Sequence, residues 1–260
     1  MESESGQPGS AIQRQHPHPR PGEIRLSAPR PLYFAYGSNL SFTQMRQRCT
    51  HDPSVSARPL AIARLDRWRW FICERGYANI LPPEDFLRVG RQVTDGDDVP
   101  VSGPEDAVYG VLYELTPADE RLLDAYEGVD HDALLAPPVK FNRAIRPREQ
   151  GKGAYNKWYV PAVVTRWLVD DGEQQQHVQT GIKTQTETVT VTVLVYVDEE
   201  RVRVGPPKTE YIARMERAIR EAETLGFPGS WAEGVMRRFL LPPIIPTPAP
   251  PPTCAAQGGS

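Results

Sequence analysis

Short apolar runs, each ended by glycine, proline or polar residues, set the pattern of the chain from residue 31 onward. The first run, Leu32 to Tyr36, is short enough for a buried strand and stops at Gly37. Glycine and asparagine tolerate backbone angles that other residues avoid, so we expect a sharp turn through Gly37-Ser38-Asn39. Ser41 and Gln44 then have the spacing of a capping box, which predicts a helix that reaches about Cys49.

Alternation of apolar and polar positions predicts most of the remaining strands. Apolar and basic residues mix from Leu60 to Ile72, and the second half of this run, with Trp68 and Trp70 on one face, is typical of a half-buried strand. The run Ala107 to Leu115 is apolar on both faces and predicts a strand that is buried on both sides. Further strand candidates are Phe86–Val89, Val139–Ile145, Trp158–Trp167 and Glu187–Val197.

A helix is predicted directly after the strand that ends near Leu115. Thr116-Pro117 is typical of a helix start, and Gly128 is typical of a helix end. We therefore expect a helix to about Tyr126 that buries Leu122, Leu123 and Tyr126.

Two more helices are predicted toward the C-terminal end. Thr209 is a plausible cap for a helix whose apolar stripe reaches Ala222, and Leu225-Gly226-Phe227-Pro228 ends it. Ser230 and Glu233 again have the spacing of a capping box, which predicts a final helix to about Phe239.

Composition divides the 260 residues into one domain and two tails. Residues 1–30 contain few large apolar residues and many of Pro, Gly, Ser, Gln and Arg, so we expect them to be disordered. The proline-rich residues 242–260 are also expected to be extended or disordered, with a proline-recognising partner as an alternative use. Residues 31–241 form the expected domain, with insertions near 83–106 and 142–186.

Charge and cysteine content argue against several function classes. A net charge of -3 and a pI near 6.0 give no reason to expect a nucleic-acid partner, so the Arg and Trp residues of 67–70 are assigned to a strand rather than to a base-stacking surface. Three widely spaced cysteines argue against a disulfide framework and a zinc site. No apolar stretch approaches membrane-spanning length, and no signal-peptide core is present, so we expect a cytoplasmic protein.

Candidate chemistry gathers at two places. Backbone N–H groups of Gly37-Ser38-Asn39 would point into one concavity that suits a carboxylate, although the turn could equally be a plain strand-to-helix connection. Glu127 falls in the last helical turn, where the helix dipole raises the pKa of its carboxyl, more so if Tyr126 excludes water. A carboxyl near neutrality suits a general base, whereas the alternative is an exposed glutamate beside a helix-ending glycine.

Four motifs occur in the order found in the gamma-glutamylcyclotransferase-like family, which the sequence therefore resembles. They are Tyr36-Gly37-Ser38-Asn39-Leu40 after the first strand, Gly76-x-Ala78-x-Ile80, the strand from Tyr109 to Tyr113, and the pair Glu127-Gly128 at a helix end. The likeness extends roughly from residue 32 to residue 240 and is interrupted by the two insertions. It implies an α+β fold in which a small, mixed, barrel-like sheet is flanked by helices.

The resemblance also implies an activity. In this family a small gamma-glutamyl compound cyclises to 5-oxoproline and releases an amine or amino acid, and no metal or cofactor is required. By analogy Glu127 is the general acid/base, and the backbone of the Gly-Ser-Asn turn holds the substrate α-carboxylate. The substrate-binding residues that the resemblance implies are Tyr36, Gly37, Ser38, Asn39, Leu40 and Tyr196.

One position departs from the family pattern. Leu134 lies where members that act on gamma-glutamyl amines often carry a tyrosine, so either the substrate differs or another residue, such as His131, replaces the missing hydroxyl. This gap keeps a non-catalytic binding or interaction module as the alternative function. A hydrolase that uses Ser38 with His131 is a third hypothesis, but the residues around Ser38 lack the Gly-x-Ser-x-Gly elbow.

Overall fold

The computed structural model describes residues 31–83, 106–135, 145–147, 155–170, 172, 182–183 and 189–240. The predicted strand Phe86–Val89, nearly all of the predicted strand Val139–Ile145, and both predicted tails lie outside these residues.

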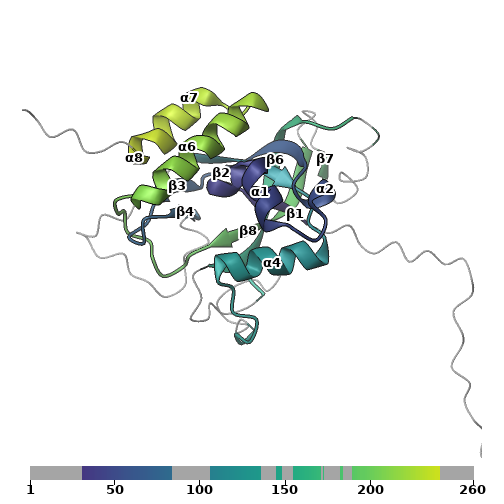
Figure 1. Ribbon diagram of the computed structural model, residues 1–260, viewed down its shortest axis with the longest axis horizontal. Coiled ribbons are helices and arrows are strands. Elements are labelled where there is room, and N and C mark those ends of the chain that lie inside the picture. The colour runs from purple at the N-terminus through teal and green to yellow at the C-terminus, as the bar shows by residue number, and fades with distance from the viewer. Residues whose placement is uncertain are drawn as a thin grey trace, which may run out of the picture.

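A closed five-stranded barrel forms the centre of the fold (Figure 1). The strands pair in the order β1-β5-β2-β6-β8 and are antiparallel, and a parallel pairing of β1 with β8 closes the ring. The α+β fold with a barrel-like sheet that the sequence predicted is confirmed. The barrel strands are β1 Leu32–Ala35, β2 Pro59–Asp66, β5 Ala107–Tyr113, β6 Asn156–Trp167 and β8 Val189–Val197.

Smaller strands and the helices surround this barrel. The short strand β7 Ile182–Lys183 pairs with β8, and β3 Arg69–Ile72 forms a separate antiparallel pair with β4 Ala78–Leu81. In Figure 1, α4 Pro117–Glu127 lies below the barrel, whereas α6 Thr209–Thr224 lies above it. The remaining helical segments are η1 Ser38–Leu40, α1 Phe42–Arg48, α2 Pro53–Ser56, α7 Gly229–Trp231, the π-helical η2 Ala232–Arg237, and α8 Arg238–Leu240.

Apolar side chains fill the barrel and the layers beneath the helices. Phe34 and Leu112 are fully buried, and burial of a side chain of this size stabilises the fold by about 1.5–3 kcal/mol. At Gly110 an added Cβ would lie 2.5 Å from the Phe34 ring, so only glycine lets the ring pass there. Helix α6 buries five of the six residues of the predicted apolar stripe and leaves Ile212 half-buried; the buried residues are Tyr211, Met215, Ala218, Ile219 and Ala222.

Local capping signals place two helices as predicted. The Ser41 side chain accepts a hydrogen bond from the Gln44 N–H at 3.0 Å at the start of α1. The Thr116 side chain accepts one from the Asp119 N–H at the start of α4, and Gly128 ends that helix with a left-handed φ of 70°. Both ends of α4, and therefore the position of Glu127, follow from local sequence.

The segment Leu60–Ile72 differs from its prediction. It divides into two strands in different sheets because Arg67 turns the chain with a φ of 66°. Strand β3 is also not half-buried: Trp70 packs in the main core, and Phe71 on the other face packs with Cys73 and Leu81. The alternation of apolar and polar residues shows which face of a strand a side chain occupies. It does not show that a second group of apolar side chains covers the outer face of β3.

Three smaller predictions were wrong. Helix α6 begins at Thr209 after Lys208, and the final helix begins at Gly229 after Pro228, so neither Thr209 nor Ser230 is an N-cap. The Tyr126 side chain is 59% exposed rather than buried.

Candidate active site

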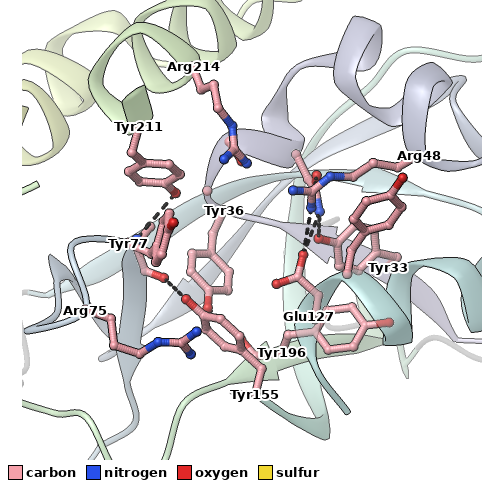
Figure 2. A pocket seen from close by; sticks show the side chains of 15 residues that line it. Tyr33, Tyr36, Arg48, Arg75, Tyr77, Glu127, Tyr155, Tyr196, Tyr211 and Arg214 are labelled. Carbon is pink, nitrogen blue, oxygen red and sulfur yellow. Dashed lines mark hydrogen bonds and ion pairs between the residues drawn. The ribbon is translucent and has the colours of Figure 1, made fainter. Parts of the chain in front are cut away.

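The structure forms a cavity of about 230 Å³ beside the barrel, at the turn after β1 and the C-terminal end of α4 (Figure 2). Among the described residues, the cavity wall combines seven tyrosines and three arginines with one carboxylate, that of Glu127. These residues come from β1 and the turn η1 after it, from α1, from β4 and the turn before it, from α4, β8 and α6, and from the residue before β6. The lining residues are Tyr33, Tyr36, Gly37, Ser38, Asn39, Arg48, Arg75, Tyr77, Ala78, Tyr126, Glu127, Tyr155, Tyr196, Tyr211 and Arg214.

The turn after β1 is shaped by close approach. Gly37 has a φ of −112° and a ψ of −143°, a pair that lies outside the α and β regions, and Asn39 lies in the 3-10 turn η1, so neither residue has a left-handed φ. A Cβ at Gly37 would instead lie 3.0 Å from the Tyr211 hydroxyl oxygen and 3.3 Å from the Ala78 Cβ. A side chain at position 37 would therefore crowd helix α6 and strand β4, and glycine suits the narrow space between them.

Asn39 uses its side chain to orient the carboxylate. Its Nδ2 donates to the Tyr33 hydroxyl at 2.8 Å and to Glu127 Oε1 at 3.2 Å. Its Oδ1 accepts from Gln44 Nε2 at 2.8 Å and from Arg48 Nη1 at 3.0 Å. Because donors and acceptor are all occupied, this amide is held in one orientation.

Glu127 has two carboxylate oxygens in different surroundings. Oε1 accepts from Arg48 Nη1 at 2.9 Å as well as from Asn39. Oε2 accepts no hydrogen bond from any residue that the structure describes, and Figure 2 shows the carboxylate turned toward the open part of the cavity. One oxygen is thus fixed by the protein, and the other is available to a ligand.

Burial raises the pKa of the Glu127 carboxyl above its ordinary value, although Arg48, Asn39 and Arg214 each lower it. The sequence predicted this direction but assigned it to the helix dipole and to Tyr126. The structure shows another source, because Tyr126 is largely exposed and the Glu127 side chain is only 17% exposed.

The two predicted tyrosines both line the cavity, but their hydroxyls contact protein groups. Tyr36 donates to the Tyr196 carbonyl oxygen at 2.6 Å, and Tyr196 donates to Asp124 Oδ1 at 2.7 Å. Burial raises the pKa of both phenols well above their ordinary value, so both stay protonated. Leu40 is absent from the cavity wall, since its side chain is fully buried in the core.

Ser38 lies at the cavity but is not arranged as a nucleophile. Its Oγ accepts from Gln44 Nε2 at 2.7 Å and from Arg214 Nη2 at 2.9 Å, and neither donor can take a proton from it. His131 is 56% exposed, and its Nε2 lies 3.3 Å from Asp124 Oδ2. His131 does not line the cavity, so it does not replace the tyrosine hydroxyl that is missing at Leu134.

Sequence reasoning missed several lining residues. Tyr155 is held by its N–H, which donates to the Glu127 carbonyl at 3.1 Å, and by its hydroxyl, which donates to the Ala78 carbonyl at 2.7 Å. Leu134, where the family pattern places a tyrosine, is 78% exposed and does not line the cavity. Arg214 lies one helical turn after Tyr211 on α6, and both side chains line the cavity.

The described part of the chain holds neither a candidate metal site nor a candidate membrane span. No group of three or more His, Cys, Asp or Glu residues there could hold a metal ion. None of the helices that the structure describes is long and apolar enough to cross a bilayer.

Several solved structures are similar to this chain in fold. No family model matches the chain, and no curated protein matches it. A structure titled gamma-glutamyl cyclotransferase is 18% identical with a TM-score of 0.44 and covers 78% of this chain and 85% of its own. A yeast cyclotransferase titled as specific to glutathione is 15% identical with a TM-score of 0.42 and covers 74% and 87%. YkqA from Bacillus subtilis is 17% identical with a TM-score of 0.45 and covers 80% and 54%. These similarities concern the fold alone.

Proposed function

We propose that this protein is an enzyme of the gamma-glutamylcyclotransferase type. The α-amino nitrogen of a gamma-glutamyl compound attacks its own gamma-carbonyl carbon, and the bond from that carbon to the departing amine breaks. The products are 5-oxoproline and an amine or amino acid. The observation that carries the proposal is Glu127, a buried carboxyl with a raised pKa and one oxygen turned into a cavity.

Glu127 would move the proton between the two nitrogen atoms. In its ionised form it takes a proton from the substrate α-ammonium group, which frees the nitrogen lone pair for attack, and it gives that proton to the departing nitrogen as the carbon–nitrogen bond breaks. The second proton, which the new ring nitrogen loses to become the lactam N–H, passes to the released amine, and the amine leaves as an ammonium ion. A pKa that burial brings toward neutrality suits both steps. Because Arg48 and Asn39 hold Oε1, we assign the proton transfer to Oε2.

The substrate α-carboxylate would be held at the turn after β1. Arg214 supports this assignment, since it donates to Ser38 Oγ at 2.9 Å and to Gln44 Oε1 at 3.2 Å, which are both neutral. No carboxylate among the described residues pairs with Arg214, so its charge is available to an anion at the turn. The backbone N–H groups of Gly37, Ser38 and Asn39 remain part of the proposed anchor.

The tyrosine-rich wall would favour the folded substrate conformation. Tyr36 and Tyr155 donate their hydroxyls to backbone carbonyls, which fixes their rings against the cavity. A confined substrate with both ends held brings its amine close to its gamma-carbonyl and avoids part of the entropy cost of ring closure.

The reaction class is tested by product analysis. Purified protein is incubated with gamma-glutamyl amino acids, gamma-glutamyl amines and glutathione, and 5-oxoproline and glutamate are both quantified. We expect 5-oxoproline without glutamate, and no product from the N-acetylated form of an active compound, because its α-nitrogen cannot attack. Glutamate release would identify a hydrolase instead. Binding without any product would favour the non-catalytic binding module.

A further inference from the structure

Positive charge exceeds negative charge on the cavity wall. Within the described residues the wall carries Arg48, Arg75 and Arg214 against the single carboxylate of Glu127. Arg48 is paired with that carboxylate, and Arg214 lies at the Gly-Ser-Asn turn, where it donates to the Ser38 hydroxyl. Arg75 is therefore a cation that neither the proposed proton transfer nor the proposed α-carboxylate anchor uses.

Arg75 reaches the cavity from a separate part of the wall. It lies in the turn between β3 and β4, and its guanidinium carbon is 5.9 Å from the centre of the Tyr77 ring and 6.0 Å from that of the Tyr155 ring. In Figure 2 it approaches beside Tyr155, away from Arg48 and Arg214. The two rings hold this guanidinium at the cavity edge.

The charge of Arg75 is only partly balanced. Its Nη1 lies 3.5 Å from Oδ2 of the buried Asp198, and Arg201 Nη1 lies 3.4 Å from the same oxygen, so one carboxylate faces two cations. Nη1 of Arg75 is buried but makes no hydrogen bond to any residue that the structure describes. That atom faces Asp198 and is closed to solvent, but the Arg75 side chain as a whole is 33% exposed, so its other guanidinium nitrogens can donate to an anionic ligand in the cavity.

We infer that Arg75 binds a carboxylate in the leaving group of the substrate, so that the cavity favours gamma-glutamyl amino acids or peptides over gamma-glutamyl amines. The inference rests on the proposed function for the identity of the ligand. The α-carboxylate lies at Arg214, the reacting nitrogen faces Glu127, and the second carboxylate lies at Arg75. A guanidinium suits this role because it can donate two parallel hydrogen bonds to a carboxylate.

A matched substrate pair isolates this contact. Gamma-glutamylethylamine is gamma-glutamyl-alanine without the carboxylate of the alanine, and the two compounds are otherwise alike. We expect the wild type to favour the alanine compound in kcat/KM by at least about tenfold, which is the size of one charged hydrogen bond. Arg75→Gln is expected to reduce this ratio by about the same factor, and Arg75→Lys to restore part of it.

Arg201→Gln is the matched control. It removes the other cation beside Asp198, and Arg201 does not line the cavity. We expect the wild-type preference to persist in Arg201→Gln. An Arg75→Gln variant that loses activity equally on both compounds, or a wild type that favours the amine, overturns the inference.

Binding separates this inference from the proposed function. If the wild type releases 5-oxoproline from no compound of the panel, the proposed function fails, and calorimetric titration of Glu127→Gln with the alanine and ethylamine compounds decides the inference. The inference is supported if Glu127→Gln binds the alanine compound at least about tenfold more tightly than the ethylamine compound and if this preference is lost when Arg75→Gln is added. Equal affinity for the two compounds, or no binding of either, overturns it.

Discussion

Replacement of Arg48 by methionine is expected to destabilise the fold in a pH-dependent way. Arg48 donates hydrogen bonds to Glu127 Oε1 at 2.9 Å and to Asn39 Oδ1 at 3.0 Å. The Arg48 and Glu127 side chains are 16% and 17% exposed, so solvent screens the pair weakly. Hydrogen bonds that involve a charged group contribute ~1.5–3 kcal/mol, and we expect the variant to lose about 3 kcal/mol of the free energy of unfolding at neutral pH.

The pH dependence follows from the raised pKa of Glu127. Burial raises this pKa in the folded protein, and Arg48 lowers it, so the variant carboxyl has a still higher folded pKa. A group with a raised folded pKa loses stability as pH rises through that pKa, and the variant loses more than the wild type. The difference between the two proteins therefore shrinks as the pH falls toward the ordinary carboxyl range and Glu127 becomes protonated.

Thermal and urea unfolding measure both effects. At about pH 7.5 a loss of about 3 kcal/mol corresponds to a fall in Tm of roughly 6–12 °C for a domain of this size, and the fall should be smaller at about pH 5. Arg64→Met is the control, because the Arg64–Asp66 pair is 36% and 49% exposed and should contribute no more than about 1 kcal/mol. Equal losses in the two variants, or a loss in Arg48→Met that does not change with pH, would refute the reasoning.

Two further predictions concern the site. If Glu127 acts as the base, kcat/KM should fall as pH decreases through a pKa above that of an ordinary glutamate; a pH–rate profile tests this, and an acid limb at the ordinary carboxyl pKa would contradict it. Tyr196→Phe removes the hydroxyl that donates to the buried Asp124, which should lower the free energy of unfolding by about 1–3 kcal/mol. Urea unfolding tests the second prediction, and an unchanged midpoint would show that Asp124 finds another donor.

Local interactions made part of the structure predictable. The ends of a helix need partners for their unpaired backbone groups, and Ser41, Thr116 and Gly128 supply these within a few residues. The position of Glu127 at the end of α4 therefore follows from sequence. The capping pattern failed at Ser230, where the helix continues from Gly229 and the side chain accepts no capping hydrogen bond, because spacing alone does not show where helical backbone begins.

The rest of the site depends on long-range packing that no local pattern encodes. Tyr155 reaches the cavity because its backbone N–H pairs with the Glu127 carbonyl, 28 residues earlier in the chain. Arg75 and Arg214 face the cavity only after the turn beyond β3 and helix α6 have packed beside β1. Burial of Glu127 likewise comes from these distant segments, which explains why the direction of its pKa shift was predicted and its physical cause was not.

The most direct test of the account is 5-oxoproline release by Glu127→Gln on the compound that the wild type cyclises fastest. Glutamine keeps the size of the side chain but cannot exchange a proton, so we expect kcat/KM to fall by about 10²–10⁴-fold while the unfolding curve shows an intact fold. Glu120→Gln is the control, because it lies on the same helix and pairs with Lys157 outside the cavity. Loss of activity in Glu127→Gln alone is the predicted result, and equal 5-oxoproline release by all three proteins would remove Glu127 from the mechanism.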